Sequence, residues 1–180
     1  MKNNRIVPFR LFEAEGIENE GRISDEIKDI LNTQIKNELM SSQIYRGVSC
    51  WCDDKGWIDA AKYYFKSAQE ELVHQDKIYE YLFSRNVLAV VPTTDDVKQE
   101  FGDIREVVEY SLEHEMEVTK NWESISESAE DDGDSTTFEF AQWFLKEQTE
   151  EEERFRNILF KMNLDLPKYE IEYLFRDLLK

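Results

Sequence analysis

The pentapeptide Glu-Glu-Leu-Val-His at residues 70–74 places a carboxylate and an imidazole one helical turn apart. Glu71 and His74 stand at positions i and i+3, so both side chains leave a helix on the same face and reach one metal ion. Glu71 also falls where the helical period of the surrounding apolar residues predicts another apolar side chain. Because such a pair is common by chance on charged helices, it indicates a metal site only together with further ligands.

Further glutamates interrupt the inward-facing stripes of three other helical segments, each near its midpoint. They are Glu38, Glu115 and, in the last of these segments, Glu151 beside Glu152. A single glutamate on such a stripe is usually a boundary residue with its carboxylate in water. The midpoints of equally long helices lie at the same height in a bundle, so we expect Glu38, Glu71, Glu115 and Glu151 to converge.

Four ionised carboxylates that meet in the interior without partners would be strongly unfavourable and would take up protons instead. Two divalent cations, with a combined charge of about +4, would neutralise them. An imidazole combined with several oxygen ligands suits iron better than it suits a closed thiolate zinc site. The combination of four helices, four central glutamates and one Glu-x-x-His pair therefore predicts a dinuclear metal site.

Five helices are predicted to position these residues, at about 24–52, 57–84, 103–129, 136–162 and 168–179. Ser24 is the expected N-cap of the first, followed by acidic residues in its first turn. Residues 53–56 and 130–135 are short turns, whereas residues 86–102, which contain Pro92 and Gly102, form a long connection. Residues 1–22 are an N-terminal extension, and residues 23–180 form one domain.

The lengths of the connections specify the topology of an all-α fold. The four long helices span about 40 Å each at ~1.5 Å per residue, and the two short turns make their flanking helices antiparallel. The long connection reaches about 55 Å when extended, enough to cross the whole bundle and leave the second and third helices parallel. The prediction is a four-helix bundle with one long crossover and a short fifth helix at the C-terminal end.

The composition argues against nucleic-acid binding, thiol redox chemistry, secretion and membrane insertion. The formal net charge of −18 argues against a nucleic-acid-binding surface and is compatible with the attraction of cations. Cys50 and Cys52 are spaced unlike a redox or zinc pair, so buried or idle thiols are expected. The first residues lack the apolar core of a signal peptide, and no apolar run reaches the ~18 residues that span a bilayer. A cytoplasmic location without membrane contact is therefore expected.

From about Ile27 onwards the chain resembles the non-haem ferritins, most closely the bacterial ones. The segments that carry the resemblance are NELMSSQIY around Glu38, AQEELVH around Glu71 and His74, LEHE ending at Glu115, and AQWFLKEQTEEE. The resemblance implies a ferritin-like di-iron four-helix bundle without haem. It also implies Fe(II) oxidation by O2 or H2O2, and a hollow homo-oligomeric shell of 24 subunits in which ferric oxide accumulates.

The resemblance also implies roles for individual residues. Glu38, Glu71 and His74 match the ligands of the first iron, and Glu71 would bridge to the second iron. Glu115 and Glu151 would complete the second position, with Gln148 placed to orient oxygen. A third iron position beside this pair would have as its ligands Glu70, Glu147, Glu150 and Glu151. Tyr45 matches the tyrosine next to the centre, where it can donate a hydrogen bond or an electron.

The two halves of the implied site are unequal. The fourth helix carries Glu147-Gln-Thr-Glu150 in place of a second Glu-x-x-His. Bacterioferritins, rubrerythrin-like proteins and the small subunits of ribonucleotide reductase are similar to one another in carrying this motif twice. A weaker second position suits a site that releases its product into a cavity, and favours storage over a resident cofactor.

Two other functions remain open at this stage. A di-iron oxidase acting on an organic substrate would share the carboxylates but need an apolar pocket beside the metals. A non-catalytic bundle would bind no metal at all.

Several single residues also keep simpler interpretations. Tyr45 is either a redox residue or a plain core tyrosine, His114 is expected at the surface or in a hydrogen bond, and Trp122 and Trp143 are expected to pack. The apolar fifth helix is expected either to join subunits or to pack within one. The acidic run 150–153 either nucleates mineral or is a solvated face, and residues 1–22 either dock on a neighbouring subunit or form a disordered tail.

Overall fold

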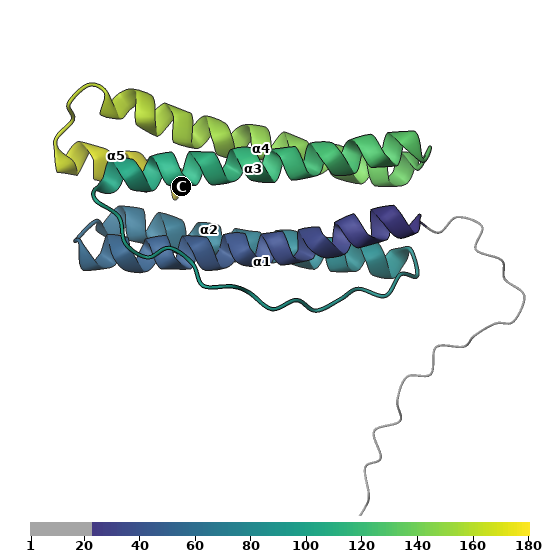
Figure 1. Ribbon diagram of the computed structural model, residues 1–180. Coiled ribbons are helices and arrows are strands. Elements are labelled where there is room, and N and C mark those ends of the chain that lie inside the picture. The colour runs from purple at the N-terminus through teal and green to yellow at the C-terminus, as the bar shows by residue number, and fades with distance from the viewer. Residues whose placement is uncertain (1–22) are drawn as a thin grey trace, which may run out of the picture.

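The computed structural model describes residues 23–180, so the predicted N-terminal extension lies outside the described residues. Within residues 23–180 the regular elements are all helices, joined by turns and one long irregular segment (Figure 1). Its helices are α1 (Asp25–Asp54), α2 (Ile58–Ser84), α3 (Ile104–Asp131), α4 (Ser135–Met162) and α5 (Lys168–Leu178). All five predicted helices are confirmed, with boundaries that differ by at most two residues. Among the described helices, none is both long and apolar enough to cross a bilayer.

Polar side chains fix where three of the long helices begin. The Ser24 hydroxyl accepts the backbone N–H of Ile27 at 3.2 Å, which confirms the predicted cap of α1. The Asp103 carboxylate accepts the N–H of Glu106 at the start of α3. The Asp134 carboxylate accepts the N–H groups of Thr136 and Thr137 at the start of α4. Gly133, with φ +68°, supplies the left-handed residue that the tight α3–α4 turn requires.

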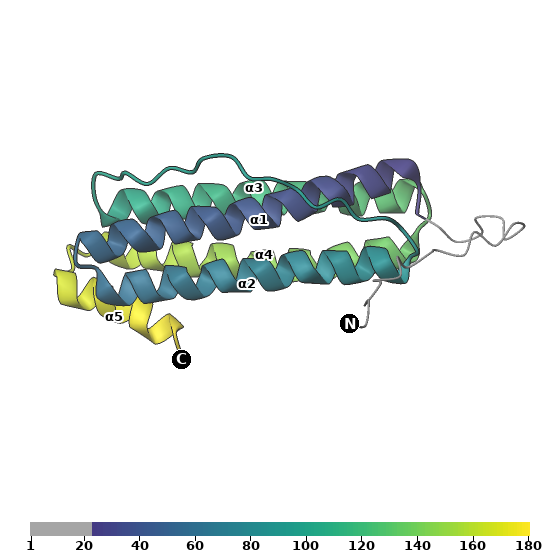
Figure 2. The same cartoon turned by 90° about the horizontal axis from the view of Figure 1, so that it is seen from below.

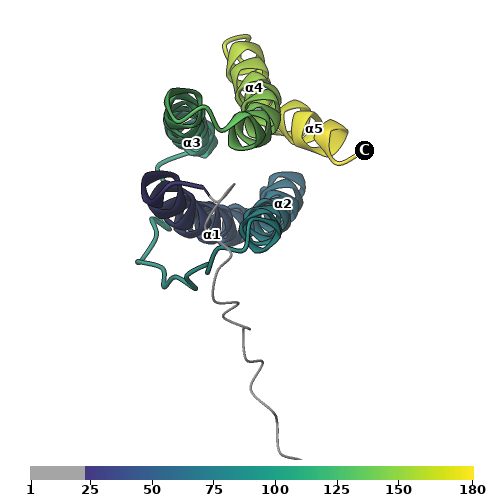
Figure 3. The ribbon, with the colours of Figure 1, turned by 90° about the vertical axis from the view of Figure 1, so that its right-hand side faces the viewer.

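The four long helices form one bundle with the predicted connectivity. Helices α1 and α2 form one antiparallel pair, and α3 and α4 form the other (Figures 1 and 3). The segment between α2 and α3 runs along the outside of α1 for nearly its whole length, so α2 and α3 are parallel (Figure 2). The N–H of Val90 donates to the Asn32 side chain at 2.7 Å, and Lys36 pairs with Asp95 at 2.9 Å. These contacts hold the long crossover against α1.

The bundle interior consists of two apolar clusters separated by a polar layer. One cluster surrounds Tyr64 and Phe155, and the other surrounds Leu31 and Trp122. Between them lie buried polar residues from all four long helices: Gln34, Glu38, Ser41, Ser42, Ser67, Glu71, His74, Gln75, Ser111, Glu115, Gln148 and Glu152. The packed clusters hold the ends of the bundle together, so the polar layer is positioned from both sides.

Helix α5 packs against its own chain, on the side of the bundle formed by α2 and α4 (Figure 3). Phe175 is fully buried beside the rings of Tyr63 and Tyr64. The Glu172 carboxylate accepts the N–H groups of Asp59 and Ala60 in the first turn of α2. The alternative of packing within one subunit is therefore confirmed. An additional contact between α5 and other subunits stays a prediction. The side chain of Tyr169, which is 70% exposed, is available for such a contact.

Candidate metal centre

The strongest cluster of metal-donor groups joins α1 to α2. One donor atom from each of Glu38, Glu71 and His74 lies within 4.8 Å of the other two, and all three residues are buried. His74 Nδ1 is 3.1 Å from Glu71 Oε2, as the i,i+3 spacing predicts. Two carboxylates and an imidazole that converge inside a protein form a donor set that fits iron or a similar divalent cation.

Glu38 is oriented by two neighbours that both donate to the same oxygen. Gln34, one turn earlier on α1, donates to Glu38 Oε1 at 2.7 Å. Trp122 on α3 donates its indole N–H to the same oxygen at 3.2 Å, while its ring stacks on Phe144 at 3.7 Å. Oε1 therefore carries both hydrogen bonds, and the carboxylate is held in one orientation. Trp122 does pack, as predicted, but its hydrogen bond to Glu38 was not predicted.

On the opposite side of the polar layer, Glu115 makes hydrogen bonds with other protein groups. Gln148 Nε2 donates to Glu115 Oε2 at 2.7 Å, and the Tyr45 hydroxyl donates to Oε1. The ring of Tyr45 is fully buried and lies near those of Tyr64 and Phe155. The structure thus brings together three residues that the sequence assigned to one site, and both oxygens of Glu115 already have partners.

The two adjacent glutamates on α4 have separate surroundings. Glu151 lies outside the three-residue cluster and pairs with Arg154 at 2.6 Å. Glu152 is the more buried residue: its carboxylate accepts a hydrogen bond from Thr119 Oγ1 at 2.5 Å and also pairs with Arg156. The sequence stripe contained both glutamates, but the residue-by-residue prediction used Glu151 alone and did not include Arg154.

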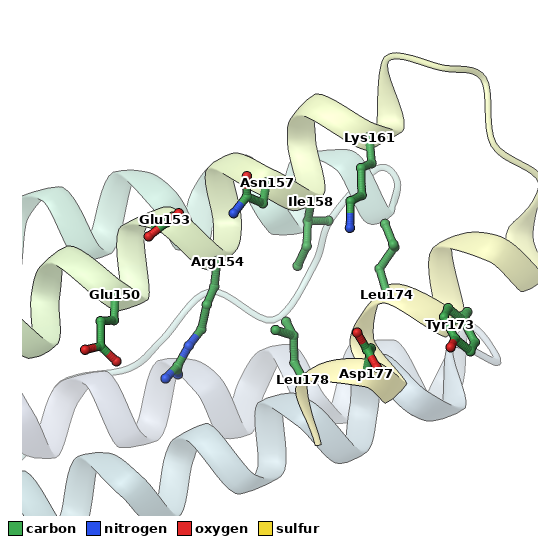
Figure 4. Close-up of a pocket in the computed structure, with 10 residues that line it drawn as sticks. All are labelled: Glu150, Glu153, Arg154, Asn157, Ile158, Lys161, Tyr173, Leu174, Asp177 and Leu178. Carbon is green, nitrogen blue, oxygen red and sulfur yellow. The ribbon is translucent and has the colours of Figure 1, made fainter. Parts of the chain in front are cut away.

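The residues expected at a third iron position divide between two cavities. Glu70, Glu147 and Glu151 line a groove of about 550 Å³ that also exposes His74 and Trp143. Glu150 instead lines a cavity of about 530 Å³ between α4 and α5 (Figure 4). Glu70 lies within 3.4 Å of Lys66. The structure therefore brings three of these four carboxylates to one groove and places the fourth next to it.

The buried carboxylates have strongly shifted acidities. Burial raises the pKa of Glu38 to about 8, and the charge of Glu71 contributes further. Burial likewise raises the pKa of Glu71 to about 8 and that of Glu115 to about 8, with the charge of Glu151 adding to both. These groups are stabilised in their protonated forms near neutral pH. A divalent cation that replaced the protons would satisfy the same oxygens as charged ligands.

The second histidine has a different environment. His114 Nε2 lies 2.8 Å from the hydroxyl of Ser41, which confirms the expected hydrogen bond. Burial lowers the pKa of His114 to about 4, so the ring is neutral near pH 7. The ring stands edge-on to Tyr45 and belongs to no cluster of metal donors among residues 23–180. The two cysteines are free thiols, with Cys50 exposed and Cys52 buried.

Comparison with known proteins agrees with this geometry. The model of the ferritin-like domain family matches residues 28–164. The chain is 36% identical to a bacterial non-heme ferritin of Staphylococcus epidermidis over 133 residues, 74% of this chain and 80% of the relative. It is 34% identical to a probable bacterial non-heme ferritin-like protein of Haemophilus influenzae over 141 residues, 78% of this chain and 86% of the relative.

Among solved structures, the chain is similar to the open-pore ferritin of the archaeon Archaeoglobus fulgidus. The TM-score is 0.82 at 28% sequence identity, over 87% of this chain and 96% of that one. The match therefore covers nearly the whole of the solved chain.

Proposed function

The chain belongs to the ferritin family, and on that premise we propose that it oxidises Fe(II) at the buried polar layer and stores the ferric product. The observation that carries the proposal is the convergence of Glu38, Glu71 and His74 on one point inside the bundle. Glu115 lies in the same layer, and Glu151 stands at its edge. Here Fe(II) is the substrate, and O2 or H2O2 is the oxidant.

In this proposal the residues of the polar layer bind two Fe(II) ions as protons leave. Glu38, Glu71 and His74 hold the first ion, and Glu71 is shared with a second ion that Glu115 and Glu151 complete. Because the pKa of each buried carboxyl lies near 8, the arrival of Fe(II) displaces protons from these carboxyls. Gln148 and Tyr45 contact Glu115 and keep hydrogen-bond donors close to the place where the oxidant must bind.

The groove on the α2–α4 side is the proposed route for iron. It exposes His74 and is bordered by the carboxylates of Glu70, Asp76, Glu80, Glu147 and Glu151. A concentration of negative charge at a concave surface raises the local concentration of cations. Carboxylates are the most numerous groups in this lining, beside the apolar Val73 and Trp143 and the cations Lys77 and Arg154, which favours iron as the substrate over the alternative di-iron oxidase.

We propose further that copies of this chain assemble into a closed shell of 24 subunits. Large apolar side chains remain exposed on the crossover and on α5, including Val91 at 83% and Tyr169 at 70%. Exposed apolar residues of this size favour association between subunits. Analytical ultracentrifugation should give a particle near 24 times the 21.5 kDa chain mass, and a monomer or dimer would contradict the shell.

Stopped-flow absorbance after aerobic addition of Fe(II) tests the oxidation directly. The Glu71→Ala variant should lose the fast ferric phase, because Glu71 is shared by both proposed positions. Glu127→Ala is a suitable control, since Glu127 is exposed on α3 and lies outside the polar layer. An unchanged rate in Glu71→Ala would show that the oxidation takes place elsewhere.

A further inference from the structure

Arg154 brings a positive charge to the edge of the polar layer. Its guanidinium pairs with Glu151 at 2.6 Å, and its side chain is one-third exposed. The charge of Glu70, from the facing helix α2, acts on the same guanidinium. Arg154 is thus a cation held among carboxylates that the proposed function assigns to iron.

The position of Arg154 in the fold is equally specific. Its side chain lines both the groove that exposes His74 and the cavity between α4 and α5. Figure 4 shows it extending from α4 across the gap toward the facing helices, with Glu150 on the same side of α4. The Arg154 side chain therefore borders both cavities, of which Glu151 lines one and Glu150 lines the other.

The hydroxyl of Tyr63 on α2 lies beside Arg154. The Tyr63 side chain is 97% buried, and its hydroxyl interacts with the Arg154 guanidinium. The pKa of Tyr63 is raised by burial and by the charge of Glu151, and is lowered by the charge of Arg154. The hydroxyl therefore lies within range of both charges.

A guanidinium paired with a carboxylate occupies the same oxygens that a metal ion would use. Iron binding at Glu151 therefore requires the Arg154–Glu151 pair to separate. Glu150 offers Arg154 a second partner, because it lies four residues earlier on the same helix, the other spacing at which side chains meet. Movement from Glu151 to Glu150 keeps the guanidinium paired while it exposes Glu151.

We propose that Arg154 is a displaceable counter-ion that competes with iron for Glu151 and so weakens the outer metal position. This inference rests on the proposed function and deepens it by naming the residue that sets the unequal affinity of the two halves. In the metal-free state Arg154 neutralises Glu151. When iron is bound, Arg154 turns toward Glu150 and the cavity between α4 and α5.

The test is a calorimetric titration of the metal-free, full-length protein with Zn(II), which binds without redox chemistry. Arg154→Leu removes the charge and retains much of the volume, whereas Arg154→Lys retains the charge. Arg156→Leu is the matched control, because Arg156 pairs with Glu152 on the same helix and is 53% exposed. Circular dichroism verifies that each variant is folded, and Arg154→Gln replaces the leucine variant if that one is not.

Arg154→Leu should bind its weaker Zn(II) about tenfold more tightly than the unchanged protein, because removal of a like charge close to a bound cation strengthens binding. Arg154→Lys and Arg156→Leu should remain within about threefold of it. Equal or weaker binding by Arg154→Leu, or an equal gain in Arg156→Leu, would overturn the inference. Failure of the unchanged protein to bind any Zn(II) would instead overturn the proposed function.

Discussion

The two halves of the polar layer use similar residues in different ways. In the α1–α2 half, Glu38, Glu71 and His74 point at one another across at most 4.8 Å. In the α3–α4 half, Glu115 bonds to Gln148 and Tyr45, and Glu151 pairs with Arg154. In the first half three donor groups converge on one point, although Glu38 Oε1 also accepts hydrogen bonds from Gln34 and Trp122. In the second half the carboxylates do not converge, and each is paired with protein groups.

In the proposed function, this difference would let a single site both capture and release iron. A metal ion that enters the α1–α2 half meets carboxylates already in place, so little reorganisation opposes binding. An ion in the α3–α4 half must displace hydrogen bonds and an ion pair first, which reduces the net affinity. We infer that the first half holds iron firmly and that the second half exchanges it.

The largest expected effect is on the tight position in the α1–α2 half. His74→Ala removes the only nitrogen ligand of the cluster, so the affinity of the tighter Zn(II) should fall at least about a hundredfold. His114→Ala is the control, because His114 bonds to Ser41 and lies outside the cluster. Isothermal titration of the metal-free proteins measures both. If His74→Ala kept its tight ion, the α1–α2 half would not be the stronger position.

A change in the second half should affect the number of bound ions instead. Glu115→Ala removes a ligand of the weaker position, so the protein should bind one Zn(II) per chain where the unchanged protein binds two. The affinity for the first ion should stay within about threefold, because Glu115 is no member of the three-residue cluster. Metal analysis after equilibrium dialysis gives the count. Loss of both ions would show that the two halves do not act separately.

The raised pKa values of the carboxyls in both halves predict how the metal-free protein responds to pH. Glu38, Glu71 and Glu115 have a folded-state pKa near 8 and an ordinary value of 4.5. Between these values the folded state binds more protons than the unfolded state, so stability is greatest below pH 4.5 with respect to these groups and declines as pH rises toward 8. Thermal unfolding at a series of pH values measures the decline.

Metal ions should reverse this trend, because they stabilise the ionised carboxylates of the folded state. Glu38→Gln provides a control in the metal-free state, since its amide does not titrate and the decline should become shallower. A melting temperature that fell as steeply with rising pH in metal-free Glu38→Gln as in the unchanged chain would contradict the assigned pKa values.

A smaller effect is expected from the contact that orients Glu38. Trp122→Phe removes the indole N–H that donates to Glu38 and retains an aromatic ring against Phe144. The tighter Zn(II) should bind about three- to tenfold more weakly, the lower end of what loss of a group that orients a ligand costs. Trp143→Phe is the control, because Trp143 is partly exposed and no hydrogen bond joins it to a carboxylate within the described chain. An equal change in Zn(II) affinity in both variants would contradict the role of Trp122 in orienting Glu38.

Nearly all of the α1–α2 half of the site could be predicted from the sequence. Glu71 and His74 share a face by their i,i+3 spacing, and Glu38 stands at the midpoint of an apolar stripe. The caps at Ser24 and Asp103 and the turn at Gly133 likewise explain why the helix boundaries were predictable within two residues. Local spacing is sufficient wherever the partners lie on one helix or at one height of the bundle.

The contacts of the α3–α4 half could not be predicted in the same way. Tyr45 reaches Glu115 from 70 residues away, and Trp122 reaches Glu38 from 84 residues away, so only the packing of the helices makes them neighbours. Glu151 and Glu152 stand about 100° apart on α4, and the rotation of the helix decides which one is buried. The local signal for Arg154 was its spacing from Glu150 and Glu151, and that signal did not reveal its position between two cavities.

The most direct test of the unequal affinity of the two halves is their iron content in a crystal soaked anaerobically with Fe(II). Anomalous diffraction at the iron edge measures the occupancy of each position. We predict a strong peak among Glu38, Glu71 and His74 and a weaker one beside Glu115 and Glu151. Absence of iron from the first place, or a stronger peak at the second, would contradict it.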